Sequence, residues 1–288
     1  HTDFSNYGGA ERRLFDLNEN NFYLNTTFRK RTSGGWNWFA GAAFSFFEQK
    51  IGNVSLSTDH WMEQQQELHA KAKVFKRISP AFRLDMGVES FIRRYENRYQ
   101  YQMKEAEGID SHYKMNPTIS AGFLSATYYP VEQLKAELSV RTEYTSLNEK
   151  VNFSPRLAVN YCLGDVVLSA TAGRYTQLPV SRLLAQENKL KSESCIQYNV
   201  GAQYEGDGRF YKAELYYKKY DRLALVEKGT VDAAEVLTSG GYGYSKGFDL
   251  FFNDRVLLKN LEYQLSYTYN IAKRKFQEYT ELTTPQYA

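Results

Sequence analysis

Strict alternation of apolar and polar residues is the feature that most limits what this chain can fold into. In FRLDMGVESFIRR, residues 82–94, the apolar phase holds Phe82, Leu84, Met86, Val88 and Ile92, and the charged residues occupy the other phase. The same period of two recurs over 68–74, 134–144 and 261–269. Because successive side chains of a strand point to opposite faces, each segment predicts a strand with one apolar and one polar face.

The alternating segments predict about twelve strands. We place them at 21–31, 36–48, 64–77, 81–97, 112–129, 132–147, 151–163, 165–178, 194–205, 208–222, 243–254 and 258–275. Residues 61–77 are rich in good helix formers, but their apolar residues recur at every second position, which favours a strand. Short turns rich in Gly, Asp and Pro alternate with longer connections, which is typical of an antiparallel up-and-down meander.

Strand length and aromatic placement favour a membrane barrel over a soluble sandwich. Several predicted strands reach about 15 residues, whereas globular strands average ~5–6 and strands that cross a bilayer need ~9–11 within the hydrocarbon. The chain has 24 Tyr, and no run of 18 apolar residues. Tyrosine and tryptophan collect at bilayer interfaces, and here they occupy apolar-phase positions near strand ends: Trp36, Trp38, Tyr129, Tyr144, Tyr161, Tyr204, Tyr211, Tyr217, Tyr267 and Tyr269. The predicted fold class is therefore all-β, an antiparallel transmembrane β-barrel with its apolar phase toward lipid.

Three later segments resemble a known family. They are NFSPRLAVNY (152–161), TAGRYTQLP (171–179) and ENKLKSESCIQYNVGAQY (187–204). Together with the strands that follow, up to residue 275, they are similar to the TonB-dependent receptors of Gram-negative outer membranes. The resemblance implies a barrel of about 22 strands, closed by a plug and energised by TonB.

About twelve strands cannot form that whole barrel, so we expect residues 1–288 to be a single domain that is part of one, without the plug and the last strands. The partners implied are outer-membrane lipid and lipopolysaccharide, the plug of the same protein, TonB through the missing amino-terminal part, and a surface lipoprotein. The net charge of +3 gives no field that would recruit nucleic acid.

Charged residues of the polar phase are the candidates for the wall of the barrel lumen: Arg83, Asp85, Glu89, Arg93, Lys135, Glu137, Arg141 and Arg156. Two interpretations stay open, a solvated wall that packs against a plug and a direct path for a substrate. Aromatic residues that flank the longer connections are the candidates for ligand contact from outside: Trp61, Tyr95, Tyr99, Tyr101, Tyr113 and Tyr175.

No motif for catalysis, metal binding or a cofactor stands out, so we expect no enzyme. GGYGYSKG (240–247) superficially suggests a phosphate loop, but an alternating strand follows it in place of a helix. The function that the sequence favours is active uptake of a scarce nutrient across the outer membrane. A structural anchor without transport and a soluble carbohydrate-binding β-protein are the alternatives.

Overall fold

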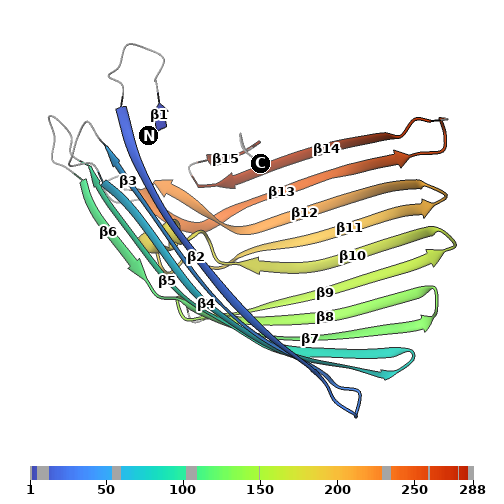
Figure 1. Cartoon of the computed structure of the whole chain (residues 1–288). Helices are drawn as coiled ribbons and strands as arrows, with labels where there is room; N and C mark the ends of the chain where they lie inside the picture. The colour runs from blue at the N-terminus through green and yellow to red at the C-terminus, as the bar shows by residue number, and fades with distance from the viewer. Residues whose placement is uncertain are drawn as a thin grey trace.

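One curved antiparallel sheet makes up almost the whole chain (Figure 1). The computed structural model describes residues 2–4, 13–53, 60–101, 109–148, 150–228, 235–258, 260–277 and 279–284. Strands pair with their neighbours in chain order, and within the described residues the two edge strands do not pair with each other. The predicted antiparallel up-and-down fold is confirmed, as a sheet that is open along one side.

The strands are long and are joined in chain order. Their bounds are β1 (Thr2–Phe4), β2 (Arg13–Arg31), β3 (Asn37–Asn53), β4 (His60–Ser79), β5 (Phe82–Tyr101), β6 (Ile109–Met115), β7 (Thr118–Val131), β8 (Leu134–Thr145), β9 (Lys150–Leu163), β10 (Val166–Gln177), β11 (Glu193–Gly206), β12 (Arg209–Lys228), β13 (Glu235–Asp254), β14 (Tyr263–Phe276) and β15 (Tyr279–Thr283). One short helix, α1 (Ser181–Gln186), interrupts the connection between β10 and β11.

The strand prediction was wrong in one internal place. The predicted strand 112–129 is two strands, β6 and β7, and both pair with β5. The break falls at Asn116 and Pro117, because proline has no N–H to donate to a ladder. Residues 61–77 form part of β4, as the alternation predicted. The segment 240–247 lies inside β13 and is not a loop.

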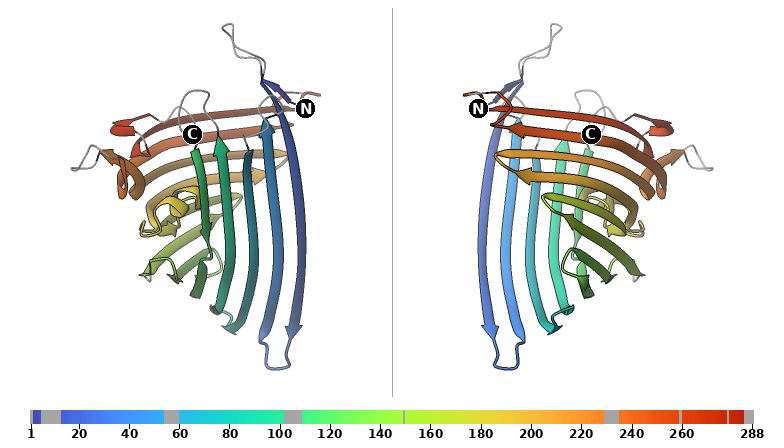
Figure 2. Two further views of the ribbon diagram at one scale, coloured as in Figure 1. Left: turned by 90° about the vertical axis from the view of Figure 1, so that its left-hand side faces the viewer. Right: turned by 90° about the vertical axis from the view of Figure 1, so that its right-hand side faces the viewer.

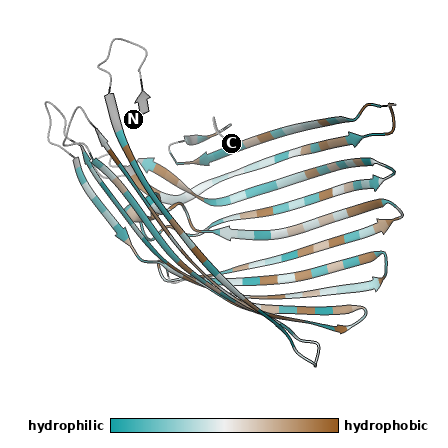
Figure 3. Ribbon diagram, viewed as in Figure 1, coloured by the Kyte–Doolittle hydropathy of each residue, from teal (hydrophilic) through white to brown (hydrophobic). Residues whose placement is uncertain are grey.

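The apolar phase forms a face that the described residues leave exposed. Val88, Leu138 and Leu215 are 62%, 63% and 58% exposed, although they lie in the middle of long strands. Their cross-strand neighbours on this face are also apolar or small, as with Ala72 and Gly122 beside Val88. A face of this size in water would aggregate, so its natural environment is hydrocarbon. We call it the outer face. Figure 3 shows hydrophilic and hydrophobic residues following one another along the strands.

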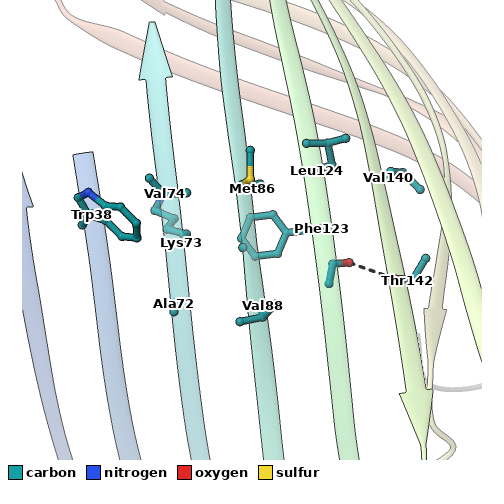
Figure 4. Close-up of a pocket in the computed structure, with 12 residues that line it drawn as sticks. Trp38, Ala72, Lys73, Val74, Met86, Val88, Phe123, Leu124, Val140 and Thr142 are labelled. Carbon is teal, nitrogen blue, oxygen red and sulfur yellow. Dashed lines mark hydrogen bonds between the residues drawn. The ribbon is translucent and has the colours of Figure 1, made fainter. Parts of the chain in front are cut away.

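The outer face is hollowed where its side chains are small. A depression of about 480 Å³ includes Ala72 and Gly122 in its lining, together with the larger Trp38, Val74, Met86, Val88, Leu124 and Val140 (Figure 4). On the same face Tyr144 and Tyr161 are 41% and 40% exposed near the ends of their strands. The prediction was wrong for Tyr217, Tyr267 and Tyr269, which are 42–53% exposed but lie further inside β12 and β14. The prediction for Tyr129 was wrong: Tyr128 shares the alternation phase of Leu124 and is the exposed ring, whereas Tyr129 lies beside the Arg77 guanidinium on the opposite face.

The buried core lies on the other face, under the connection between β10 and β11. We call residues 178–192 the inward loop, because it crosses the concave side of the sheet to reach β5 and β6 (Figure 2). Its Leu183, Leu184 and Leu190 pack with Tyr95 and Met115 in one buried cluster. The face that carries this cluster is the inner face.

Helix α1 is too short to be stable alone. It has six residues and no side-chain cap at its first turn, so the packing of Leu183 and Leu184 holds it in place. Hydrogen bonds from Asn148 Nδ2 to the Leu190 carbonyl (3.0 Å) and from the Lys191 N–H to Ser239 Oγ (2.9 Å) fasten the rest of the inward loop. Among the described residues, no helix is long and apolar enough to span a membrane.

Glycines on the inner face let large side chains lie flat against the sheet. A Cβ at Gly87 would lie 2.5 Å from the Phe123 ring, and a Cβ at Gly247 would lie 2.7 Å from Tyr216 Oη. Both distances are far below van der Waals contact, so these positions exclude any other residue without a shift of the neighbour.

Candidate functional site

An ion-pair network lies at the centre of the inner face. Glu89 accepts hydrogen bonds from Arg141 Nη1 at 2.6 Å and from His69 Nε2 at 2.8 Å, and Lys71 Nζ lies 3.6 Å away. Arg141 also contacts Glu143 at 3.1 Å. The side chain of Glu89 is only 9% exposed, so this carboxylate organises cations from β4 and β8. Such a network gives the inner wall fixed charges in fixed places.

The other charged candidates share this face in smaller groups. Arg83 binds Asp85 through two hydrogen bonds of 2.7 Å, Lys135 lies 3.3 Å from Glu137, and Arg93 pairs with Glu67. Arg156 stands apart from the acids, with its guanidinium 4.4 Å from the centre of the Tyr175 ring. The pairing registers place all eight predicted residues on the inner face: Arg83, Asp85, Glu89, Arg93, Lys135, Glu137, Arg141 and Arg156.

Removing Glu89 is expected to destabilise the wall. The substitution Glu89→Ala leaves the half-buried Arg141 without its shortest contact, which predicts a loss of about 1–3 kcal/mol of unfolding free energy. The matched control is Glu137→Ala, because Glu137 is 36% exposed and its single ion pair is with a more exposed lysine. Urea unfolding of the full-length protein in lipid vesicles measures both. Equal losses would show that the network has no special role.

The aromatic candidates of β4, β5 and β6 form one group on the inner face, at the end of the sheet with the longer connections. Trp61 lies opposite Tyr99 in the β4–β5 pairing, and Tyr99 lies opposite Ser111 of β6. Tyr113 is opposite Asn97 in the next row. The side chains of Trp61, Tyr99 and Tyr113 are on the same face of the sheet as that of Arg93. They therefore extend the inner wall toward the longer connections.

Three aromatic candidates lie elsewhere or deeper. Tyr95 is 2% exposed beneath the inward loop, so it packs in the core and does not reach a ligand from outside in this structure. Tyr95 and Tyr99 occupy the same alternation phase of β5, so the sequence does not distinguish them. They differ because the inward loop, which is distant in the chain, covers Tyr95. Tyr175 lies on β10 and stacks with Arg156. The side chain of Tyr101 lies outside the described residues, although its backbone pairs with Ile109.

A cavity of about 860 Å³ separates the inward loop from the inner wall. The wall contributes Glu63, Gln65 and Arg93, and the inward loop contributes Arg182. Sequence reasoning missed Glu63 and Gln65, although they share the phase of Trp61. It could not have found Arg182, because nothing in the sequence places the inward loop across the sheet. Among the described residues, no group of three or more His, Cys, Asp or Glu side chains is arranged to hold a metal ion.

An apolar outer band, interfacial tyrosines and a polar inner wall on antiparallel strands define the wall of a transmembrane β-barrel. The family comparison agrees with this class. A family model described as the TonB dependent receptor-like β-barrel matches residues 1–287. The chain therefore belongs to the TonB-dependent receptor β-barrel family, whose members are outer-membrane proteins of Gram-negative bacteria that transport nutrients.

Solved structures share the fold at low sequence identity. The outer membrane transporter YddB from Escherichia coli superposes with a TM-score of 0.75 at 9% identity, over 93% of this chain and 46% of that one. The FrpB iron transporter from Neisseria meningitidis gives 0.71 at 12%, over 92% and 45%. The copper transporter OprC gives 0.70 at 16%, over 89% and 47%.

The chain spans less than half the length of these solved relatives. No curated protein matches its sequence significantly. Identities of 9–16% support the fold alone. The predicted barrel class and family are confirmed, and the roles of the individual wall residues stay predictions.

Proposed function

We propose that the chain forms about half of the barrel of an outer-membrane receptor that captures a scarce nutrient outside the cell and passes it to the periplasm. The observation that carries this proposal is the cavity between the inward loop and an inner wall with aromatic residues at its outer rim. The parent protein would supply the plug and the remaining strands, and TonB would supply the energy through the amino-terminal part. A surface lipoprotein is a further partner in this proposal.

The chemical character of the inner wall changes along the strands, from aromatic to polar to charged. Trp61 and Tyr99 present aromatic faces nearest the longer connections, which face outward in outer-membrane barrels. Further along the same strands lie the polar cavity and then the Glu89 network. An incoming ligand would stack on the aromatic rim first, and the charged wall below would hold a plug by complementary ion pairs.

The names of the structural relatives leave the cargo open. One is an iron transporter and another is a copper transporter, and their likeness to this chain extends to the fold only. The proposed activity is therefore the uptake of a scarce nutrient.

A rim mutant tests the proposal. Cells that express the full-length protein would be given labelled ferric chelates, copper(II), cobalamin and maltooligosaccharides in turn, with and without a protonophore. We expect energy-dependent uptake of one of these, lowered about tenfold by Trp61→Ala with Tyr99→Ala, because each ring contributes roughly 0.5–1.5 kcal/mol of stacking. The control is Tyr198→Ala, which removes an outer-face ring that is 52% exposed.

Two results would contradict it. Absence of energy-dependent uptake of every nutrient, together with loss of a surface assembly when the gene is deleted, would favour a structural anchor. A full-length protein that stays out of the membrane and binds a sugar in solution would favour the soluble carbohydrate-binding alternative.

A further inference from the structure

Two arginines on the inner face of β9–β14 differ from the arginines of β5 and β8. The charges of Arg83, Arg93 and Arg141 are neutralised by carboxylates. Among the described residues, no carboxylate forms an ion pair with Arg156 or Arg274, and the Nε atom of each is buried without a hydrogen-bond partner. Burying part of a guanidinium without an acceptor is unfavourable, so these two groups are available to an anion from outside the wall.

Each of the two arginines is held by a tyrosine ring. The Arg156 guanidinium lies 4.4 Å from the centre of the Tyr175 ring, and the Arg274 guanidinium lies 4.5 Å from the centre of the Tyr220 ring. A cation–π contact fixes the position of a cation without neutralising its charge. Both positive charges are therefore ordered in advance and remain free to attract an anion.

Glycines let both arginines reach across a neighbouring strand. Arg156 of β9 lies opposite Gly173 of β10, where an added Cβ would be 3.0 Å from Arg156 Cγ. Arg274 of β14 lies opposite Gly243 of β13, where an added Cβ would be 2.8 Å from Arg274 Cγ. A side chain at either glycine would displace the arginine beside it. The two guanidinium groups thus extend toward β11 from opposite sides.

Strand β11 lies between the two arginines and carries short polar side chains there. Cys195 lies opposite Tyr175 on one side and opposite Tyr220 on the other. Gln197 is the next residue on this face, and it lies opposite Lys218 of β12, a third cation without a carboxylate partner among the described residues. Neighbouring strands are about 4.8 Å apart, so the two tyrosines are separated by roughly 10 Å. The inner face over β11 is therefore bordered by three cations.

The nearest acids of this wall do not neutralise the three cations. Glu193 lies one row toward the longer connections, where it accepts a hydrogen bond from Gln177 Nε2 at 2.9 Å. Glu214 and Asp249 lie opposite each other, two rows toward the short turns, and Glu214 is 3.0 Å from Lys212 Nζ. The rows that hold the cations contain no acid of their own, so their charge is positive.

We propose that Arg156, Arg274 and Lys218 bind a small polyanion over β11, a molecule with two or more carboxylate or phosphate groups. This inference rests on the proposed function, because the polyanion would be the nutrient or its charged part. Guanidinium groups bind carboxylates and phosphates through paired hydrogen bonds. Two of them held on opposite sides of β11 suit one molecule with several anionic groups better than a single small ion. Gln177, at the same end of β10, lines the cavity under the inward loop, so the site borders that cavity.

The test measures binding to the purified full-length protein by calorimetry, without any energy source. The probes are tricarballylate and fructose bisphosphate, each beside its neutral counterpart, the triamide and fructose. We expect at least one anion to bind and neither neutral compound to bind; the tighter anion identifies the preferred group. The double substitution Arg156→Gln with Arg274→Gln is expected to weaken the affinity at least about tenfold, since charge-assisted hydrogen bonds are lost. The matched control, Lys212→Gln with Lys273→Gln, removes one cation that Glu214 already neutralises and one on the outer face.

A glycine variant tests the geometry with every charge in place. Gly173→Ala adds a methyl group against Arg156 and the Tyr175 ring, so we expect weaker binding from a protein that still folds, as shown by its heat-dependent mobility on gels. Equal affinities of the double variant and its control would overturn the proposal. So would a full-length protein that binds neither anion, as when an acidic segment of the protein itself occupies the site. Energy-dependent uptake of a neutral nutrient by such a protein would leave the proposed function in place.

Discussion

Replacing Leu124 with arginine is expected to destabilise the folded protein in the membrane by about 2–4 kcal/mol. Leu124 is 44% exposed on the outer face and lies in the middle of the apolar band, between Met86 of β5 and Val140 of β8. An arginine there must leave water and enter hydrocarbon without a partner. Folding of the full-length protein into vesicles, followed by heat-dependent mobility and urea unfolding, measures the loss.

The neighbouring position provides the matched control. Ser125 projects to the inner face, opposite Asp85, and its hydroxyl donates to Glu137 Oε1 at 3.2 Å. The substitution Ser125→Arg adds the same charge to the same strand but beside two carboxylates and water. We expect it to fold almost as well as the parent. If both arginines impair folding equally, the assignment of lipid to the outer face is wrong.

Leu184→Asp is expected to release the inward loop from the wall. Leu184 is 2% exposed in the cluster with Tyr95 and Met115, and a carboxylate there would be buried without a partner. Because α1 has only six residues, it cannot stay folded once this packing is lost. Hydrogen exchange should show fast exchange of the amides of Leu184 and Glu187, whose N–H groups bond to the carbonyls of Val180 and Leu183.

The exposed Gln186 offers a comparison within the same helix. Gln186→Asp introduces the same charge without entering the cluster. We expect slow exchange of the α1 amides to persist in this variant, and the strands to be protected in both. Fast exchange in the unmodified protein would show instead that the inward loop is not held by the cluster.

The fold could be read from the sequence wherever one strand face meets apolar surroundings and the other meets polar ones. A shift of one residue would turn every side chain of β5 to the wrong face, so its alternation fixes both the strand and its two faces. The predicted strand boundaries were wrong where the alternation of apolar and polar residues does not mark the end of a strand. Proline at 117 divides two strands that read as one, and β1 and β15 are short segments that the pattern did not reveal.

Only part of the candidate site could be predicted from the sequence. Alternation correctly grouped Arg83, Asp85 and Glu89 on one face, but hydrogen-bond partners such as His69, which contacts Glu89, depend on the pairing of strands. The aromatic candidates looked alike in the sequence, and the structure separates exposed Tyr99 from buried Tyr95.

The sequence by itself determined the strands, their two faces and the need for an apolar environment, because these depend on the local period of two. Only the tertiary structure decided which residues the inward loop covers and which cationic side chains contact Glu89. Those features join residues that are distant in the chain, and their contacts depend on the register and curvature of the whole sheet.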